Sequence, residues 1–190
     1  MGVIHFHLEG PAPRLAPEVS SSFRHRALFI GANAREAVND GRADYVPIFL
    51  SDVPELFSRR VLPLDAVLIN VSVPDANGYC SLGTSVDAAL SATRASTTVI
   101  AQLNRSMPRT LGDSFIHVGE IDLGVEVDVQ PPEHHQPAIG DVAIGEHVAE
   151  LVPDGATLQM GIGSIPLRSA WPCAARRTSA STPSSSPMPS

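Results

Sequence analysis

Several residue types and patterns are scarce in this chain, and each scarcity argues against a class of protein. Its two cysteines, Cys80 and Cys173, are too few and too far apart for a disulfide framework or a zinc knuckle. No apolar run approaches the roughly 18–20 residues that a membrane helix needs. The N-terminus has no basic leader before an apolar stretch, so we expect no secretory signal and a reducing, cytoplasmic location.

Positive charge is also scarce. The 13 Lys and Arg residues face 20 Asp and Glu residues, which gives a formal net charge of −7 at pH 7. This balance argues against a partner that is bound through nucleic-acid phosphates. It still allows a small anionic ligand, because backbone N–H groups at the start of a helix can hold one. A length of 190 residues, 43% of them hydrophobic, is enough for one domain with a sizeable core.

Short strand and helix patterns alternate along residues 1–166. Strands are predicted at 1–8, 23–30 (centred on the letters ALFI), 44–50, 66–69, 97–103, 114–118, 125–129 and 156–160. Helices are predicted at 34–39, after the Ser51-Asp52 cap, at 85–96 and at 139–152. The last helix should be amphipathic, with one side lined by Ile139, Val142, Ala143, Val148, Leu151 and Val152. This alternation is typical of an α/β fold with a mainly parallel open sheet.

The stretch from Ala66 to Gly83 organises the chain. It opens with an apolar run, Ala66 to Ile69, that is typical of a strand buried on both faces. The turn-forming residues Pro74 to Gly78 follow directly. Ligands of open α/β sheets gather in the loops after the carboxyl ends of strands, so this loop is a candidate edge of a site. An ordinary turn between two core elements is the alternative.

A second candidate for ligand binding is the loop that follows the last predicted strand. Gly161 to Pro166 carries two glycines, which leave backbone N–H groups unshielded for a phosphate or an oxyanion. The same residues also form ordinary tight turns. His5 and His7 form an H-x-H pair on one face of a strand, but no neighbouring Cys or carboxylate completes a set of ligands. We therefore predict no metal site and interpret the pair as a half-exposed strand face.

The character of the sequence changes at Leu167. Residues 167–190 are rich in Ser, Pro and Ala and have almost no core-forming periodicity. Such a segment cannot bury enough apolar surface to offset its chain entropy, so we expect disorder. The predicted organisation is a folded part, residues 1–166, followed by a disordered tail, residues 167–190.

Five segments taken together resemble one family, in the order in which that family carries them. They are EGPAP from Glu9, ALFIGANAREAVNDGRADYVPIFLSDVPELF from Ala27, VSVPDANGYCSLGTSVD from Val71, VIAQLNRSMPRTLGDSFIHV from Val99 and DGATLQMGIGSIP from Asp154. The family is that of acetyl-CoA hydrolases and transferases, which includes acetate and 4-hydroxybutyrate CoA-transferases. Each motif is loose by itself, but the ordered set is specific.

The resemblance implies a CoA-transferase-like fold with two related halves. Such enzymes move CoA between an acyl-CoA and a carboxylate such as acetate, or to water, through a glutamyl-CoA thioester. Coenzyme A or acyl-CoA is then the substrate, no covalently bound cofactor is expected, and the intact protein is expected to be a homo-oligomer. The segment that would contact CoA is Gly161, Ile162, Gly163, Ser164 and Ile165. The loops Val73–Gly78 and Gln102–Arg109 are expected to border the same cleft.

The chain departs from the family pattern at both ends. The family begins some tens of residues before Met1, and its glutamate nucleophile lies beyond Pro166 in a motif resembling H-T-E-M. This sequence has no such motif and no glutamate after Pro166. We therefore assign no catalytic residue, although the carboxylates of Glu120, Glu126 and Glu133 are available. The expectation is a partial domain that is inactive as it stands.

Two further interpretations of the chain stay open. It would be a non-catalytic module that binds CoA or a related nucleotide, or a partial domain that does not fold stably alone. The tail would be out-of-frame translation in a fragment of a longer transferase, or the end of a genuine short protein. Among single residues, we interpret Cys80 as a buried structural thiol, and Arg109 as a surface loop arginine rather than a phosphate contact.

Overall fold

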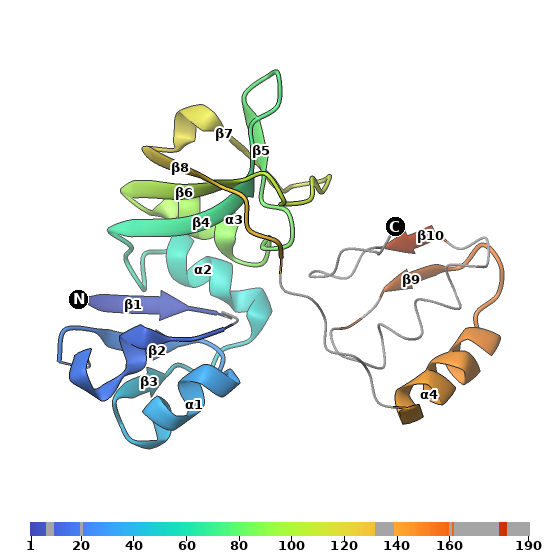
Figure 1. Ribbon diagram of the computed structural model, residues 1–190, viewed down its shortest axis with the longest axis horizontal. Coiled ribbons are helices and arrows are strands. Elements are labelled where there is room, and N and C mark those ends of the chain that lie inside the picture. Colours follow the sequence, from blue (N-terminus) through green and yellow to red (C-terminus); the bar gives the residue numbers. More distant parts are fainter. Residues whose placement is uncertain (7–9, 20, 132–138, 160, 162–178, 182–190) are drawn as a thin grey trace. The chain divides into compact units, whose positions relative to one another are not determined.

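The computed structural model describes residues 1–6, 10–19, 21–131, 139–159, 161 and 179–181. The chain divides into two compact units, Met1–Leu64 and Asp65–Ser190 (Figure 1). The sequence did not predict this division, and the boundary predicted at residue 166 falls outside the described residues, so it stays a prediction.

The first unit holds a three-stranded parallel sheet in the order β1-β2-β3. Its strands are β1 (Gly2–His5), β2 (Arg24–Ala27) and β3 (Ala43–Tyr45). Its helices are α1 (Ala32–Asn39) and α2 (Val53–Ser58), with short 3-10 turns η1 (Pro13–Leu15), η2 (Pro17–Val19) and η3 (Leu50–Asp52). The core between α1, η1 and the sheet consists of Leu15, Ala34, Ala37 and Ala43. Small alanines therefore let α1 pack closely on β3.

The second strand of this unit lies within its predicted range of residues 23–30, but it is shorter, and the apolar residues ALFI (27–30) supply only its last position. Strand β2 covers Arg24–Ala27 and ends before Leu28. Its side chains alternate, because Arg24 and Arg26 are exposed while His25 and Ala27 are buried. A histidine thus occupies a core position of a period-two strand, and the apolar residues after Ala27 made the predicted strand three residues too long at its C-terminal end.

The second unit is built on a parallel sheet in the order β4-β6-β8. Its strands are β4 (Ala66–Ser72), β6 (Thr98–Asn104) and β8 (Leu123–Val127). A small antiparallel pair, β5 (Tyr79–Ser81) and β7 (Phe115–His117), follows the first of them, and η4 (Val118–Glu120) follows β7. Helix α3 (Ala89–Ala95) contacts β4. The core of the unit comprises Ile69, Val71, Cys80, Leu82, Leu90, Val99, Ala101 and Ile116.

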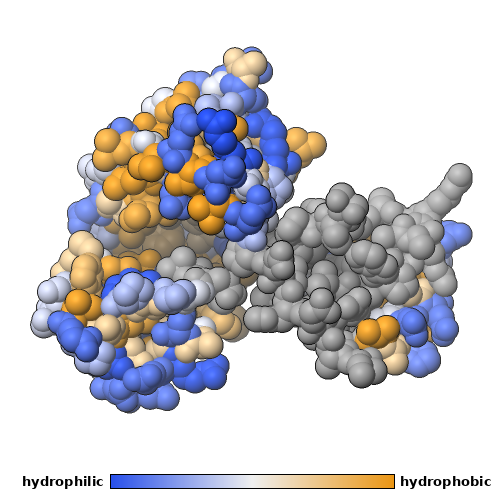
Figure 2. Space-filling model, viewed as in Figure 1, coloured by the Kyte–Doolittle hydropathy of each residue, from blue (hydrophilic) through white to orange (hydrophobic). Residues whose placement is uncertain are grey.

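Only one face of this sheet is buried, so the prediction that the strand at Ala66–Ile69 is buried on both faces is wrong. Ile69 and Val71 enter the core, whereas Leu68 is 79% exposed. Leu68 lies beside Ile100 and, through it, beside Leu123 in the strand register. Figure 2 shows apolar surface over this part of the chain. The strand has the apolar composition of a doubly covered sheet, but no described element covers its second face.

The remaining elements are α4 (Ile139–Glu150), β9 (Thr157–Gln159) and β10 (Ser179–Ser181), with β9 and β10 paired in parallel. The predicted helix is confirmed, but its predicted apolar face is wrong, because Val142 and Val148 are exposed and Ala149 is buried. Strand β10 also differs from the disorder expected for residues 179–181. The rest of the tail lies outside the described residues.

The fold class predicted from the sequence is confirmed, since three of the four sheets in the described residues are parallel. Within that same part of the chain, no helix is both long and apolar enough to cross a membrane. The strand predicted at 125–129 begins two residues earlier, at Leu123. His5 is buried on β1, while His7 lies outside the described residues. The described residues contain no group of three or more His, Cys, Asp or Glu able to hold a metal ion.

Candidate functional site

The loop after β4 is a closed turn organised by Asp75. One oxygen of the Asp75 carboxylate, Oδ1, accepts hydrogen bonds from the backbone N–H groups of Asn77 and Tyr79, both at 2.9 Å. Gly78 has a positive φ of 82°, and a Cβ there would lie 2.8 Å from Nε2 of His117. The turn-forming residues of this stretch therefore adopt a specific geometry, in which position 78 favours glycine.

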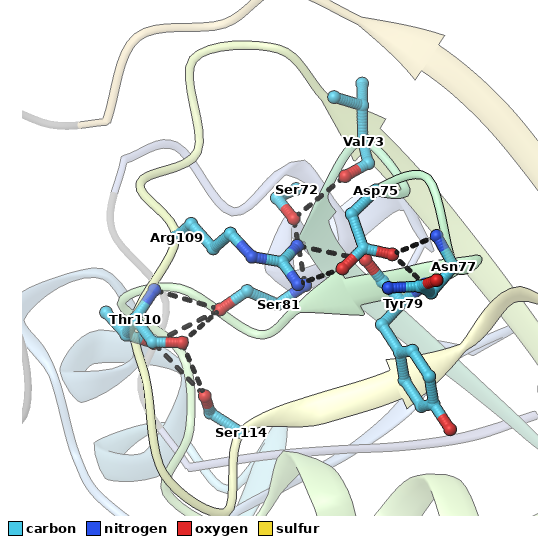
Figure 3. A network of polar contacts seen from close by, with 9 residues as sticks. All are labelled: Ser72, Val73, Asp75, Asn77, Tyr79, Ser81, Arg109, Thr110 and Ser114. Carbon is cyan, nitrogen blue, oxygen red and sulfur yellow. Dashed lines mark hydrogen bonds and ion pairs between the residues drawn. The ribbon is translucent and has the colours of Figure 1, made fainter.

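Arg109 fastens this turn to the loop that follows β6 (Figure 3). Its guanidinium donates to Oδ2 of Asp75 at 2.6 Å and to the carbonyl of Tyr79 at 3.0 Å. It also lies 4.8 Å from the centre of the Phe115 ring. The Tyr79 N–H is the main cause that lowers the pKa of Asp75, and the Asn77 N–H and Arg109 act in the same direction. Arg109 is an exposed arginine in a loop, as the sequence interpretation expected, but it also clamps two loops together, which the sequence did not predict.

A cluster of hydroxyl groups lies next to this clamp. Ser81 is fully buried, and its Oγ accepts from the backbone N–H groups of Gly83 and Thr110, both at 3.1 Å. The Thr110 hydroxyl donates to the carbonyl of Gly83 at 3.0 Å, and the Ser114 hydroxyl donates to the carbonyl of Thr110 at 3.0 Å. Ser72, at the end of β4, accepts from the Ser81 N–H at 2.8 Å. These bonds join the ends of β4 and β5 to the loop before β7 (Figure 3).

The carboxyl end of β6 is held by a buried amide. Asn104 is 1% exposed, and its side chain donates to the carbonyl of Val129 at 2.8 Å and accepts from the Val129 N–H at 3.0 Å. The same oxygen accepts from the Ser106 N–H at 3.1 Å. A side chain thus replaces a backbone ladder pair and extends the contact between β6 and the segment after β8. The result is a rigid edge at the carboxyl ends of β4 and β6.

The two loops predicted to border a common cleft are therefore in contact with each other. The ion pair of Asp75 and Arg109 joins Val73–Gly78 to Gln102–Arg109. Of the five residues predicted to contact CoA, the structure describes Gly161 alone, two residues after the last residue of β9. The other four, Ile162, Gly163, Ser164 and Ile165, lie outside the described residues. Their assignment as a CoA-contacting segment stays a prediction.

Two of the three glutamates that the sequence analysis named as available carboxylates, Glu120 and Glu126, have structural partners. Glu120 Oε1 accepts from the His117 N–H at 3.1 Å and closes a capping box around η4. Glu126 forms an ion pair with Arg105 at 2.8 Å. Glu133 lies outside the described residues. Cys80 is fully buried and burial raises the pKa of its thiol, which agrees with a structural role and disfavours a thiolate nucleophile.

Comparison with known proteins identifies the relationships of the chain. The family model described as acetyl-CoA hydrolase/transferase N-terminal domain matches residues 12–133. A 4-hydroxybutyrate coenzyme A transferase of Clostridium kluyveri is 50% identical over 166 residues, which cover 86% of this chain and 39% of that protein. A succinyl-CoA:acetate/propanoyl-CoA:succinate CoA transferase of Fasciola hepatica is 45% identical over 168 residues, covering 86% of this chain and 34% of that protein.

Solved structures agree with these matches. RipA from Yersinia pestis has a TM-score of 0.76 and 30% identity, over 90% of this chain and 42% of that one. A 4-hydroxybutyrate CoA-transferase from Porphyromonas gingivalis has a TM-score of 0.65 and 28% identity, over 93% of this chain and 48% of that one. The chain thus spans less than half of the length of each of these proteins.

Proposed function

The chain belongs to the acetyl-CoA hydrolase/transferase family, and on that premise we propose that it is the N-terminal part of a CoA-transferase. The proposed reaction moves CoA between an acyl-CoA and a small carboxylate such as acetate. The observation that carries the proposal is the 50% identity over 166 residues with a 4-hydroxybutyrate coenzyme A transferase. We place the protein in the cytoplasm, with the intact transferase as a homo-oligomer and without a nucleic-acid partner.

In this proposal, the described chain supplies one wall of the site and no nucleophile. The pinned loops after β4 and β6 form a pre-organised edge, since Asp75 and Arg109 hold each other in place without a ligand. Such an edge suits a substrate that must be oriented, because little ordering entropy remains to be lost on binding. The glycine N–H groups of residues 161–165 are proposed to approach the CoA moiety or the thioester oxygen.

Chemistry in the family runs through a glutamyl-CoA thioester, and the resemblance assigns its glutamate to an H-T-E-M-like motif that this sequence does not contain. Glu120 caps η4 and Glu126 pairs with Arg105, so each carboxylate already has a partner. We therefore propose that the 190-residue chain binds CoA compounds without turning them over.

A paired measurement tests binding and turnover separately. The purified 190-residue chain is melted with and without acetyl-CoA, and the exchange of CoA between butyryl-CoA and acetate is followed by chromatography. We expect a melting temperature that rises with acetyl-CoA concentration and an exchange rate equal to the blank. Gly163→Ala should abolish the rise, whereas Gly2→Ala should not, because nothing lies within 4 Å of a Cβ added there.

Each other outcome contradicts a definite part of the proposal. Turnover above the blank would show that a carboxylate in this chain can serve as the nucleophile. A sharp melting transition without any response to acetyl-CoA would show that this chain does not bind CoA by itself. A chain without a cooperative transition would favour the partial domain that does not fold stably alone.

A further inference from the structure

A cluster of buried polar side chains lies in the first unit, and the proposed CoA chemistry does not use it. His25 on β2 is fully buried, and its ring centre lies 4.3 Å from that of His5, which is 9% exposed on β1. Arg14, in η1, is partly exposed, and the next residue, Leu15, packs in one core cluster with Ala43, which pairs with His25 in the sheet. Three groups that can carry positive charge thus meet beside the core of a small sheet.

Within the described residues, four nitrogens of Arg14 and His25 lack a hydrogen-bond partner. Both ring nitrogens of His25 are buried in this way, and so are Nε and one terminal nitrogen of Arg14. Buried polar groups in folded proteins are nearly always paired, and an unpaired buried guanidinium is especially unfavourable. Such a group calls for a partner that the described residues do not supply, and a ligand or ordered water can fill that role.

The unpaired edge of Arg14 specifies the chemistry of that ligand. Nε and a terminal nitrogen form the side-on fork of a guanidinium, whose two parallel N–H bonds match two oxygens of a carboxylate or a phosphate. His25 adds a further N–H donor from the imidazole beside it. A metal ion is disfavoured at this place, because the arginine keeps its positive charge at all physiological pH values.

We propose that Arg14 and His25 form a binding site for a small oxyanion, a carboxylate or a phosphate group, that reaches them along the partly exposed Arg14 side chain. The anion would accept the fork of Arg14 and a ring N–H of His25. It would neutralise the buried charge, and it would favour the protonated form of His25. This site is independent of the proposed transferase function, because it uses no residue of the edge formed by the loops after β4 and β6.

Histidine NMR on the full 190-residue chain tests the site. The imidazole signals are followed at pH 7 and constant ionic strength while sodium phosphate, and in a separate series sodium acetate, is added. We expect saturable shifts of the His25 and His5 signals and an apparent pKa of His25 that rises with the anion. The stronger of the two series identifies the phosphate or the carboxylate as the preferred group.

Variants separate a specific site from general effects of salt. Arg14→Gln should weaken binding at least tenfold, and Arg14→Lys, which keeps the charge but loses the fork, should weaken it by an intermediate factor. Arg26→Gln is the matched control, since Arg26 is an exposed arginine on the same strand as His25 and should leave binding unchanged. Thermal melts establish that each variant is folded.

Three results would overturn the proposal. The first is a pair of linear, non-saturable titrations with both anions. The second is equal binding by the wild type and a folded Arg14→Lys or Arg14→Gln variant. The third is a crystal structure grown with the preferred anion in which water alone occupies the Arg14 fork.

Discussion

Mild acid should destabilise the first unit through His25. The imidazole is fully buried and makes no hydrogen bond to the part of the chain that the structure describes, so its charged form loses hydration without gaining a partner there. Burial is the main cause that lowers the pKa of His25 to about 4, and the charge of Arg14 adds to it. An unfolded histidine has a pKa of about 6.5. The folded and unfolded chains therefore bind different numbers of protons between these two values.

The sign and size of the effect follow from linkage. Below pH 6.5 the unfolded chain binds a proton at His25, whereas the folded chain does not until the pH nears 4. The free energy of unfolding therefore falls as the pH falls. With the two pKa values above, the loss is about 2 kcal/mol at pH 5 and about 3 kcal/mol at pH 4. Above pH 7 this group contributes no pH dependence.

Urea unfolding followed by circular dichroism from pH 4 to pH 8 measures this loss, in buffers without phosphate or carboxylate. His25→Leu removes the titrating group but no hydrogen bond, and it should flatten the pH profile relative to the wild type by the amounts given above. His147→Leu is the control, because the side chain of His147 is 79% exposed and should leave the slope unchanged. Parallel profiles for wild type and His25→Leu would refute the reasoning.

Three further substitutions test the second unit by chemical denaturation. Gly83→Ala should cost about 2–4 kcal/mol, because φ is +58° there and a Cβ would lie 2.2 Å from the sulfur of Met107; a loss below 1 kcal/mol would contradict this geometry. Asn104→Ala should cost about 2–4 kcal/mol by leaving the backbone groups of Val129 unpaired, and Asn104→Asp should restore little. Arg109→Gln should cost about 1 kcal/mol, since its ion pair is partly exposed, and it should speed amide exchange in the turn after β4; unchanged exchange would show that the clamp is dispensable.

The sequence predicted the type and order of most elements, because apolar periodicity is a local property. The strand at Thr98–Asn104 and the helix at Ala32–Asn39 lie within two residues of their predicted bounds. Strand β2 lies within its predicted range, but its inward positions hold His25 and Ala27, which a hydropathy pattern does not identify as core. The exposure of Leu68 was missed for a different reason, since composition cannot tell how many faces of a strand are covered.

The site was predicted as residues 161–165 bordered by two loops, and the contacts that join the two loops were not predicted. Pro74–Gly78 has the composition of a turn, and the structure confirms a turn in which the Asp75 carboxylate accepts from the backbone N–H groups of Asn77 and Tyr79. Its ion pair with Arg109 spans 34 residues, so no local pattern could reveal it. The bond from the Ser81 hydroxyl to Thr110 spans 29 residues in the same way. Polar residues are common in loops, so their presence in the sequence did not indicate these roles.

The arrangement of charges in the second unit bears on how a transferase site would be divided within a longer chain. Asp75, Glu120 and Glu126 each accept hydrogen bonds that fix backbone or an arginine, so their carboxylates serve to shape the unit. A carboxylate that must attack a thioester has to remain accessible and must not be neutralised by a fixed partner. A carboxylate that holds a loop in place needs fixed partners, whereas a nucleophilic carboxylate needs to be free of them. For the proposed transferase, we therefore expect a nucleophile that is separate from the edge formed by the loops after β4 and β6, and none of the three carboxylates named above is free for that role.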